Sequence, residues 1–478
     1  MTSYLVTTTP PTPNGDLHVG HLSGPFLAAD VFCRYQRSRG RRVVFATGSD
    51  DHQTYVLTAA LKQGRDPAEL AGAYADEIEA TLAAAEVRVD SFARSLGDPA
   101  HRRLTQELFR ELIDRGLVER RRYRALCCTS CERLLFEGFL QGRCPRCGAD
   151  TPGHLCEMCG RVGAAADLVE PYCALCKGAP AETEREAFFF PLEPHRWRLE
   201  EFWATRTGWR PHLRAYCEEM LAEPLPDYQV SYPGSWGVPV PSGEPEVVNV
   251  WLEMYAGHVL AARTAGVATG EETDFTLVQF LGHDNSFYNA VLHTAVALAL
   301  GGSWPLPEHL VTNEFYFLED KKFSTSRNHM ISARHALKAL GPDNLRFHLA
   351  RTNPERWQSN FSLAAANETR QREIQNIWAP AIEGLKHLAL QAPVGGSTDL
   401  RILGLVEGAR ADLERHYDAE TFSLRQASNT LLGLATAAAD LARRESNSPQ
   451  PGRSTDATTL LRALAEFAAP LMPQRCSC

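Results

Sequence analysis

Four pairs of cysteines constrain the fold of this chain more than any other feature of its sequence. Each pair has the spacing CxxC, and all four lie between residues 128 and 176, in a stretch rich in glycine, proline and arginine. Two such pairs complete a tetrahedral four-thiolate shell around zinc that leaves no position for water. Redox pairs or chance explain four repeats less well. We therefore predict structural zinc bound by Cys128, Cys131, Cys144, Cys147, Cys156, Cys159, Cys173 and Cys176.

The length and composition of the chain are those of a globular protein with more than one domain. It has 478 residues, of which 44% are hydrophobic and 22% charged, so a sizeable core is expected. Because we find neither a signal peptide nor an apolar stretch long enough to cross a bilayer, we expect a cytoplasmic protein without a membrane partner. The net charge of −9 argues against nucleic-acid binding over the whole surface but leaves local basic patches open.

The N-terminal part of the chain predicts a βαβ unit and therefore a parallel sheet. The run YLVTTT (4–9) predicts a strand, residues 21–39 have helical spacing, and RVVFATG (42–48) predicts a second strand. The turn after the first strand reads PNGDLHVGH, which puts His18 and His21 where a strand ends and a helix begins. Isolated histidines at such places are most often surface or core residues. Strand ends and helix N-termini also favour anions, however, so these imidazoles are candidates for binding phosphates.

The remaining pattern alternates between helical and extended segments. Residues 53–124 read mainly as helices, VVNVWLEM (247–254) and FTLVQFLGHD (275–284) predict strands, and the chain from about residue 333 reads as almost entirely helical. Residues 102–124 contain eight arginines. For this basic segment we favour an amphipathic helix with a solvated face over a contact with RNA.

Several collinear segments resemble class I aminoacyl-tRNA synthetases, most closely methionyl-tRNA synthetase. PNGDLHVGH resembles the HIGH signature, and NVWLE, FLGHD and KKFSTSRNHMI follow it, so the resemblance covers most of residues 4–365. It implies an α/β fold with a Rossmann-type parallel sheet, a zinc-knuckle insertion and an α-helical C-terminal domain. The implied domains are two catalytic halves (1–122 and 233–312), the insertion (123–232), a stem-contact-like region with a KMSKS-like loop (313–365) and a helical domain of degenerate anticodon-binding type (366–478).

The resemblance also implies the chemistry and the residues of the site. An amino acid would react with ATP, with Mg²⁺ present, to give an aminoacyl-adenylate and pyrophosphate. His18 and His21 would bind the phosphates, Asp284 the ribose, and Asp50 the α-ammonium group. The implied catalytic residues are His18, His21, Lys321, Lys322 and Arg327; those for ATP are Asn14, Gly20, Gly282, Asp284, Ser324 and Ser326; those for the amino acid are Pro10, Thr12, Asp50, Trp251, His258, Asn289 and His293.

The four-pair version of the insertion in this family binds two zinc ions, one shared by the inner pairs and one by the outer pairs. The resemblance therefore implies two structural Zn²⁺ sites. One would be formed by Cys144, Cys147, Cys156 and Cys159, and the other by Cys128, Cys131, Cys173 and Cys176.

Three departures from the family pattern bear on function. In the loop KFSTS, Thr325 replaces the family's second lysine, so Lys321 or Arg327 would have to substitute for it. The pocket positions Pro10, Thr12, His258, Asn289 and His293 differ from the apolar and aromatic set of methionine enzymes. They predict a small or polar amino acid, such as glycine, serine, alanine or an acidic one.

The third departure lies in the helical domain. The segment NETRQREIQNIWAPAIEGL lacks the family's asparagine-rich face, and the later loop SNSPQPGRS lacks a tryptophan. Such groups read unpaired RNA bases by stacking and hydrogen bonding. Residues 366–478 also contain 13 acidic and 12 basic residues, which predicts little attraction to phosphates.

From these departures we predict a ligase that does not use tRNA and transfers the aminoacyl group to a small-molecule nucleophile, such as a hydroxyl or N-hydroxylamine. Methionyl-tRNA-synthetase-like proteins of natural-product biosynthesis, including the ligase half of hydrazine synthetases, are of this kind. For them the acceptor would be an N-hydroxylated amino acid, and a cupin would be the partner protein. The alternatives are a divergent methionine–tRNA ligase and a non-catalytic binding paralogue.

Overall fold

The computed structural model describes residues 3–267, 275–301, 304–319, 321–322, 331–391, 397–445 and 452–475; for Lys321, Lys322 and Gln391 it describes the backbone only. The chain forms two compact units, each built from separated segments. The first comprises residues 1–16, 42–80 and 89–312, and the second comprises residues 17–41, 81–88 and 313–478. Two elements, α4 (Pro67–Ala84) and β14 (His309–Asn313), pass from one unit to the other.

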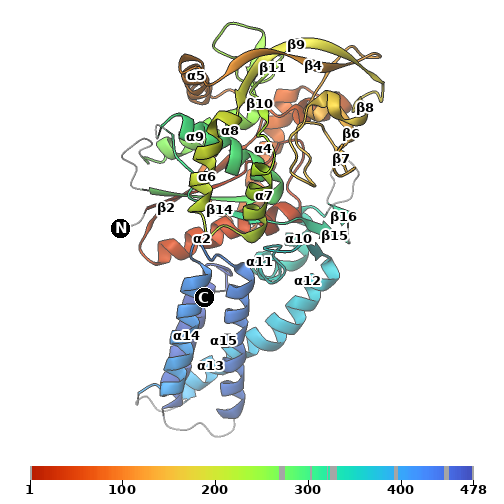
Figure 1. Cartoon of the computed structure of the whole chain (residues 1–478). Coiled ribbons are helices and arrows are strands. Elements are labelled where there is room, and N and C mark those ends of the chain that lie inside the picture. Colours follow the sequence, from red (N-terminus) through yellow and green to blue (C-terminus); the bar gives the residue numbers. More distant parts are fainter. Residues whose placement is uncertain are drawn as a thin grey trace. The chain divides into compact units, whose positions relative to one another are not determined.

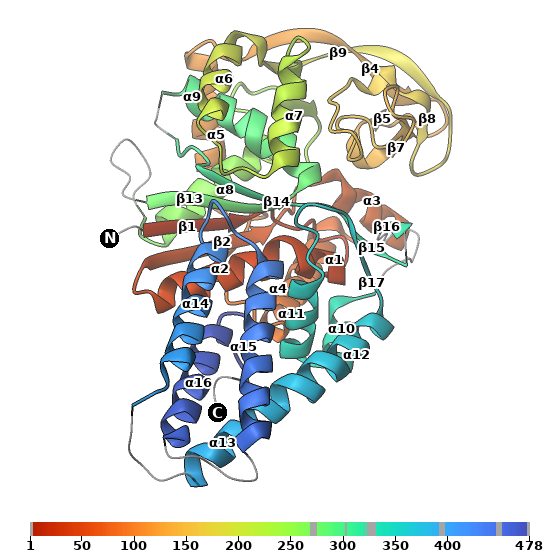
Figure 2. The same cartoon turned by 60° about the horizontal axis from the view of Figure 1, so that its bottom comes forward.

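A five-stranded sheet forms the centre of the first unit. Its order is β14-β13-β1-β2-β3, where β1 is Ser3–Thr8, β2 is Arg42–Ser49, β3 is Ser91–Arg94 and β13 is Phe275–Gly282. β1 pairs in parallel with both β2 and β13, and the three strands lie side by side (Figure 2). This is the Rossmann order, in which the direction of winding reverses between β1 and β13, and ligands bind at the carboxyl ends of the strands there. The predicted α/β fold class is confirmed.

The central position of β1 follows from its residues. Leu5 and Val6 are both buried, so side chains on both faces of the strand lie in the interior, as in sheets covered on both sides. Two polar residues at its end, Thr7 and Thr8, are buried as well. The register pairs Thr7 with Gln279 on β13 and with Ala46 on β2. A polar patch is thereby built into the end of the sheet where ligands are expected.

Helices and further strands complete the first unit. The helices are α3 (Thr54–Gln63), α5 (Pro99–Asp114), α6 (Arg196–Ala204), α7 (Pro211–Leu221), α8 (Val250–Thr264) and α9 (Thr294–Ala299), and a wide helical turn spans Phe287–His293. The strands are β4 (Glu119–Cys128), β5 (Leu134–Leu135), β6 (Leu140–Arg143), β7 (Asp150–Thr151), β8 (Val169–Cys173), β9 (Pro180–Pro191), β10 (Asp227–Gln229), β11 (Ser231–Pro233) and β12 (Glu246–Val248).

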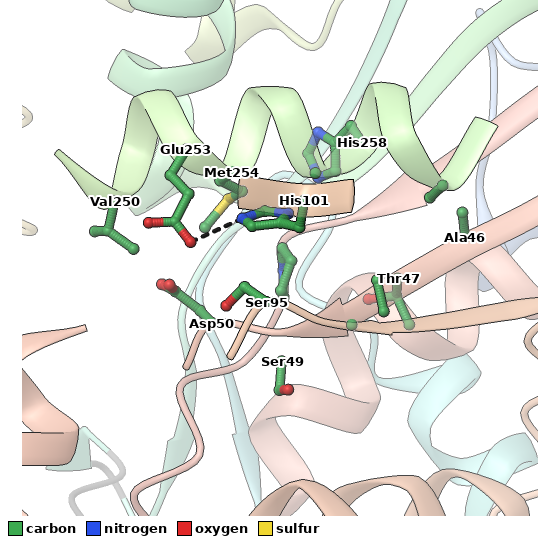
Figure 3. A pocket seen from close by; sticks show the side chains of 15 residues that line it. Ala46, Thr47, Ser49, Asp50, Ser95, His101, Val250, Glu253, Met254 and His258 are labelled. Carbon is green, nitrogen blue, oxygen red and sulfur yellow. Dashed lines mark hydrogen bonds and ion pairs between the residues drawn. The ribbon is translucent and has the colours of Figure 1, made fainter. Parts of the chain in front are cut away.

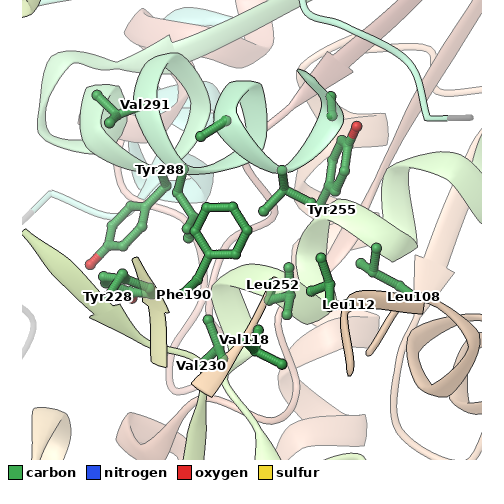
Figure 4. Close-up of a cluster of buried hydrophobic side chains, with 14 of the residues drawn as sticks. Leu108, Leu112, Val118, Phe190, Tyr228, Val230, Leu252, Tyr255, Tyr288 and Val291 are labelled. Carbon is green, nitrogen blue, oxygen red and sulfur yellow. The ribbon is translucent and has the colours of Figure 1, made fainter. Parts of the chain in front are cut away.

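A large hydrophobic cluster fixes α8. Leu252 of α8 belongs to a cluster that also contains Leu108 and Leu112 of α5, Phe190 of β9 and Val291 (Figure 4). On its other side α8 contributes apolar residues to a second cluster, formed with β1, β2 and β13. Burial of apolar area on two faces holds this helix against the sheet, which matters because α8 carries much of the pocket described below.

The second unit contains a short sheet and a helical bundle. Its strands are β15 (Tyr316–Leu318), β16 (Lys321–Lys322) and β17 (Ser359–Phe361). Its helices are α1 (Val19–His21), α2 (Leu27–Ser38), α10 (Ala333–Leu340), α11 (Pro342–Arg351), α12 (Leu363–Thr369), α13 (Ala379–Gln391), α14 (Leu400–His416), α15 (Leu424–Glu445) and α16 (Arg453–Ala468). Helices α13, α14 and α15 run alongside one another (Figure 1).

Two predicted elements were wrong. Residues 102–124 are not one basic helix, because α5 ends at Asp114 and the last arginines lie on β4, which pairs antiparallel with β9. There the arginines face acidic side chains; Arg121, for example, lies 2.7 Å from Asp227. Residues 247–254 are not one strand, because the side chain of Asn249 accepts a hydrogen bond from the Trp251 N–H and thereby caps α8.

None of the helices that the structure describes combines the length and the apolar character needed to cross a membrane.

Candidate active site

A pocket lies between α8 and the carboxyl-terminal parts of β2 and β3. Three of the residues predicted to bind the amino acid, Pro10, Asp50 and His258, line it together with Glu253 and His101 (Figure 3). It therefore occupies the end of the sheet at which a Rossmann-type fold binds its ligands.

Asp50 is the first residue after β2, and its backbone N–H donates to the carbonyl of Pro11 at 3.0 Å. Its side chain is buried, and burial raises its pKa well above the usual range; the nearby carboxylate of Glu253 raises it further. Figure 3 shows the two carboxyl groups turned toward each other. A bound cation would reverse this effect by favouring the charged carboxylate. Asp50 is therefore suited to hold an ammonium group.

Glu253 is a buried carboxylate held by two histidines. Its Oε1 lies 2.6 Å from Nδ1 of His52 and 2.8 Å from Nε2 of His101. Burial alone would raise the pKa of Glu253, but the two imidazoles outweigh it and lower the pKa to about 2. Burial would likewise lower the pKa of His52, yet the Glu253 carboxylate raises it overall. This arrangement keeps one negative charge fixed in the wall of the pocket.

Four other predicted amino-acid-binding residues lie outside the pocket lining. The indole of Trp251 stacks on Tyr288, with 3.5 Å between ring centroids. Nε2 of His293 lies 2.7 Å from the carbonyl of Trp251, and the amide of Asn289 donates to the carbonyl of Asn285 at 3.0 Å. Thr12 accepts a turn hydrogen bond from the N–H of Asn14 through its carbonyl. In this structure, these contacts stabilise the helices and the turn next to the pocket.

The residues predicted to hold the nucleoside follow β13. Gly282 ends this strand, and Asp284 lies in the 3₁₀ turn His283–Asn285 that comes next. A Cβ on Gly282 would lie 2.3 Å from Oδ1 of Asp284, so any larger residue would displace this carboxylate. Glycine at position 282 thus lets Asp284 fold back over the strand end, at the carboxyl edge of the sheet.

In the second unit, His18 and His21 form one compact pair. Their rings stack with centroids 3.8 Å apart, and Nδ1 of His21 accepts a hydrogen bond from the backbone N–H of His18 at 3.3 Å. Burial lowers the pKa of His21 to about 4, so the ring is neutral at pH 7. Because Nδ1 accepts, the proton lies on Nε2, which is then a donor for an anion. Gly20 stands between them, and its carbonyl accepts from the hydroxyl of Ser23.

The same histidine turn is attached to the chain that follows the KMSKS-like loop. Lys321 and Lys322 form β16, paired with β15, while Ser324, Ser326 and Arg327 lie outside the described residues. Where the described chain resumes, the carbonyl of Ile331 accepts from the N–H of Val19 at 3.2 Å, and Ser332 forms a bridge with His18. Ile331 and Ser332, which follow the predicted ATP loop in the sequence, therefore contact the HIGH-like turn.

The eight cysteines lie in two groups within the first unit. Cys128, Cys131, Cys173 and Cys176 form one, and Cys144, Cys147, Cys156 and Cys159 form the other, each with its sulfur atoms within 4.8 Å of one another. The closest sulfur pairs are 3.4 to 3.8 Å apart. Four thiolates around zinc at about 2.3 Å lie about 3.8 Å from one another. Both groups therefore have dimensions that fit a tetrahedral metal site.

Four residues in or next to the pocket were not predicted from the sequence: His52, His101, Glu253 and Gln279. His52 follows Asp50 closely, and Glu253 lies in the quoted NVWLE segment, so both stood beside recognised signals. His101 and Gln279 carry no local signal, because their role depends on packing of α5 and β13 against α8.

Comparisons with known proteins agree with this architecture. The family described as tRNA synthetases class I (M) matches residues 4–383. The chain belongs to this family. The methionine–tRNA ligase of Pyrococcus furiosus is 31% identical over 401 residues, covering 79% of this chain and 55% of that protein. That of Thermomicrobium roseum is 32% identical over 380 residues, covering 77% of this chain and 65% of that protein.

The chain thus spans 55% to 65% of the length of these curated relatives. Among solved structures, Mycobacterium tuberculosis methionyl-tRNA synthetase in complex with methionyl-adenylate is similar with a TM-score of 0.78. The similarity covers 100% of this chain and 93% of that one, at 22% sequence identity. This structure shares the fold of the class I synthetase.

These relatives overturn the predicted acceptor. The tRNA-independent transfer to a small-molecule nucleophile is wrong, because proteins about 31% identical over most of the chain are methionine–tRNA ligases. Neither an N-hydroxylated acceptor nor a cupin partner has support in the comparisons. The wrong prediction was based on the helical domain. We interpreted the absence of the family's asparagine-rich face and tryptophan as a loss of tRNA recognition. Helical bundles retain their packing while surface residues change, so the absence of a familiar surface pattern does not show that the function is lost.

Proposed function

We propose that this protein is an amino acid–tRNA ligase that uses ATP to activate its amino acid. The substrate carboxylate attacks the α-phosphorus of ATP, and pyrophosphate leaves. A ribose hydroxyl of tRNA then attacks the carbonyl of the aminoacyl-adenylate, and AMP leaves. A carboxylate needs no general base for the first step, so the protein acts mainly by positioning the reactants and stabilising charge.

The observation that carries this proposal is the buried pocket with Asp50 at the carboxyl end of a Rossmann-type sheet in a class I synthetase family member. In the proposed site, Asp50 holds the α-ammonium group, and Asp284 with Gly282 holds the ribose. Asn14, Gly20, His18 and His21 bind ATP phosphates, with the Nε2–H of His21 as a donor. Lys321, Lys322, Ser324, Ser326 and Arg327 are proposed to serve the polyphosphate, which Mg²⁺ accompanies.

The two cysteine groups are proposed to hold structural zinc. Their sulfur spacing fits four-thiolate coordination, and each group uses all four positions, so zinc would supply stability and no chemistry. A cytoplasmic location, where tRNA is charged, fits the proposed use of tRNA.

The test combines two assays. Amino-acid-dependent ATP–pyrophosphate exchange measures activation, and labelled amino acid with total tRNA measures transfer. We expect both activities, and we expect His21→Ala to lower the exchange rate about 100-fold or more, as loss of one preorganised donor does. His335→Ala, an exposed histidine on α10, serves as the control and should leave both rates unchanged. Exchange without charging of any tRNA would contradict the proposal that tRNA is the acceptor. The absence of exchange with every amino acid would contradict the whole proposal.

A further inference from the structure

A second pocket lies within the insertion and contains no residue of the proposed active site. It is lined by parts of β4, β5, β9, β10 and β11 and of the segment 154–167, all in the first unit. It shares no lining residue with the pocket that contains Asp50. Its cavity volume is about 220 Å³, whereas one water molecule needs only about 10–15 Å³. Because voids much larger than a water molecule are few in protein interiors, this pocket is a candidate ligand site.

Aromatic rings form much of the wall of this insertion pocket. The ring of Phe136 stacks on that of Tyr232, with centroids 4.6 Å apart and planes at 16°. Tyr123 and Phe189 meet edge to face with centroids 5.8 Å apart, and Tyr228 also lines the pocket. Aromatic walls of this kind bind flat rings by stacking. The wall therefore favours a planar, ring-shaped ligand.

A chain of hydrogen bonds fixes where the proton of His154 lies. The side-chain oxygen of Asn249 accepts from the Trp251 N–H at 2.9 Å, so the other end of this amide is a donor. Its nitrogen lies 3.1 Å from the hydroxyl of Tyr232, and the same hydroxyl lies 2.7 Å from Nε2 of His154. Within the described parts of the chain these are the hydroxyl's two partners. The buried O–H is therefore satisfied only by donating to Nε2.

This assignment makes His154 a hydrogen-bond donor toward a ligand. A ring nitrogen that accepts carries no proton, so the proton of the imidazole lies on Nδ1. Among the residues that the structure describes, none bonds to this Nδ1. His154 lines the insertion pocket, where its ring meets Tyr232 edge to face with centroids 5.2 Å apart. The pocket thus combines an aromatic wall with one N–H donor of a neutral ring.

The charges around the insertion pocket limit its ligand further. The lining has one arginine and two aspartates, and all three are paired. Arg124 lies 3.0 Å from Asp167, and Asp227 lies 2.7 Å from Arg121. Binding of phosphates requires basic groups that neutralise them, and this lining has no excess of positive charge. It therefore favours a neutral ligand over a nucleotide or a nucleic-acid strand.

We propose that the insertion pocket binds a neutral planar heteroaromatic molecule, such as a free nucleobase, which stacks on the aromatic wall and accepts a hydrogen bond from Nδ1 of His154. This ligand is neither the amino acid nor ATP, so the site goes beyond the proposed function. Tyr232 both contributes to the wall and positions the proton of His154. Loss of its hydroxyl would allow that proton to move to Nε2.

The experiment measures binding to the full chain, purified with its zinc, by calorimetry in saturating ATP so that the nucleotide site is filled. The probes are hypoxanthine, which has ring acceptors, indole, which has a similar size and no ring acceptor, and inosine monophosphate. We expect hypoxanthine to bind more tightly than inosine monophosphate. His154→Phe should lower the affinity for hypoxanthine about 10-fold, as loss of one hydrogen bond does, and that for indole less than about 3-fold.

Two further variants serve as controls. Tyr232→Phe keeps the ring and removes the hydroxyl, so it should lower the affinity for hypoxanthine about 3-fold, which is less than the loss of the donor itself. His195→Phe replaces a buried histidine outside the pocket, stacked on Phe190, and should leave binding unchanged. Thermal unfolding shows whether each variant folds, and if His154→Phe does not fold, the comparison of hypoxanthine with indole on Tyr232→Phe decides.

Three results would each overturn this inference. They are the absence of saturable hypoxanthine binding by the wild type, equal losses of hypoxanthine and indole affinity in the folded variant, and tighter binding of inosine monophosphate or single-stranded RNA than of hypoxanthine. ATP–pyrophosphate exchange is measured on the same proteins and should be unchanged in His154→Phe. Failure of the inference therefore leaves the proposed function standing, and failure of exchange in the wild type is a separate result.

Discussion

In the cysteine-rich insertion, the cysteines that meet lie at most 48 positions apart in the sequence, whereas in the pocket the residues that meet come from far more distant segments. The N–H of Gly148 donates to the carbonyl of Cys144 at 2.9 Å, and that of Gly160 to Cys156 at 2.8 Å. Such turns shape each CxxC pair locally. In the pocket, Glu253 meets His52 across 201 positions of the chain and His101 across 152.

Because the contacts in the insertion are more local than those in the pocket, we expect the two regions to be stabilised in different ways. The insertion has short strands and two groups of four cysteines, so we expect its order to depend on metal binding, in which binding energy is also folding energy. The pocket depends on burial of α8 between two hydrophobic clusters, and its polar groups are maintained by that packing. The first region should respond to metal removal, and the second to changes of buried charge and to pH.

The largest expected effect is loss of zinc from the insertion. Cys173→Ser or Cys156→Ser should reduce bound zinc from two ions per chain to one and lower the free energy of unfolding by about 4 kcal/mol or more, the range of a lost metal site. Metal analysis and denaturant unfolding measure both. Cys127→Ser changes a cysteine beside Cys128 that belongs to neither group and should retain two zinc ions. Wild-type protein with fewer than two zinc ions would refute the paired sites.

A smaller effect is expected for buried charge in the pocket. Glu253→Gln breaks the ion pair with His52 inside the protein, and we expect the free energy of unfolding to fall by about 3 kcal/mol. Asp50→Asn replaces a carboxyl group that burial already disfavours, so stability should stay the same or rise, while KM for the amino acid increases about 100-fold through loss of a charged hydrogen bond. Equal destabilisation by both variants would contradict the distinct roles assigned to these carboxylates.

The smallest expected effect concerns pH. Burial lowers the pKa of His258 to about 4 and that of His293 to about 3, while the unfolded chain binds these protons near pH 6.5. Because the unfolded state takes up protons first, stability is complete above about pH 6.5 and falls as pH decreases toward 4. Each histidine should account for a loss of about 1.5 kcal/mol in the free energy of unfolding between pH 6.5 and pH 5.

Urea unfolding at pH 7.5 and pH 5 tests this on the wild type and on His293→Phe. The variant should lose less stability between the two pH values than the wild type, since one buried histidine no longer titrates. Zinc content is measured in parallel, because protonation of thiolates in the insertion would add its own loss at low pH. An unchanged difference between the two pH values in His293→Phe would show that this histidine is accessible to protons in the folded state.

Signals within short stretches of sequence predicted much of the architecture. The strand–turn–helix around His18 and His21, the strand that ends at Gly282 and the fold class all follow from such stretches. Local signals predicted the wrong secondary structure where contacts with distant segments or a helix cap decided it. The arginines of β4 read as helical until β9 supplied a pairing partner and acidic side chains, and VVNVWLEM read as a strand although Asn249 starts a helix inside it.

The sequence by itself determined which residues are candidates for binding metal and anions, because CxxC spacing and a histidine turn at a strand end are properties of a few adjacent residues. Only the tertiary structure decided which buried groups face one another: Glu253 with His52 and His101, and His258 with Gln279 and Thr7. These contacts depend on where α8 lies on the sheet, which is set by apolar packing along two whole faces of the helix. Burial then shifts the pKa values and leaves single polar atoms without a partner, and no local pattern of residues reveals either effect.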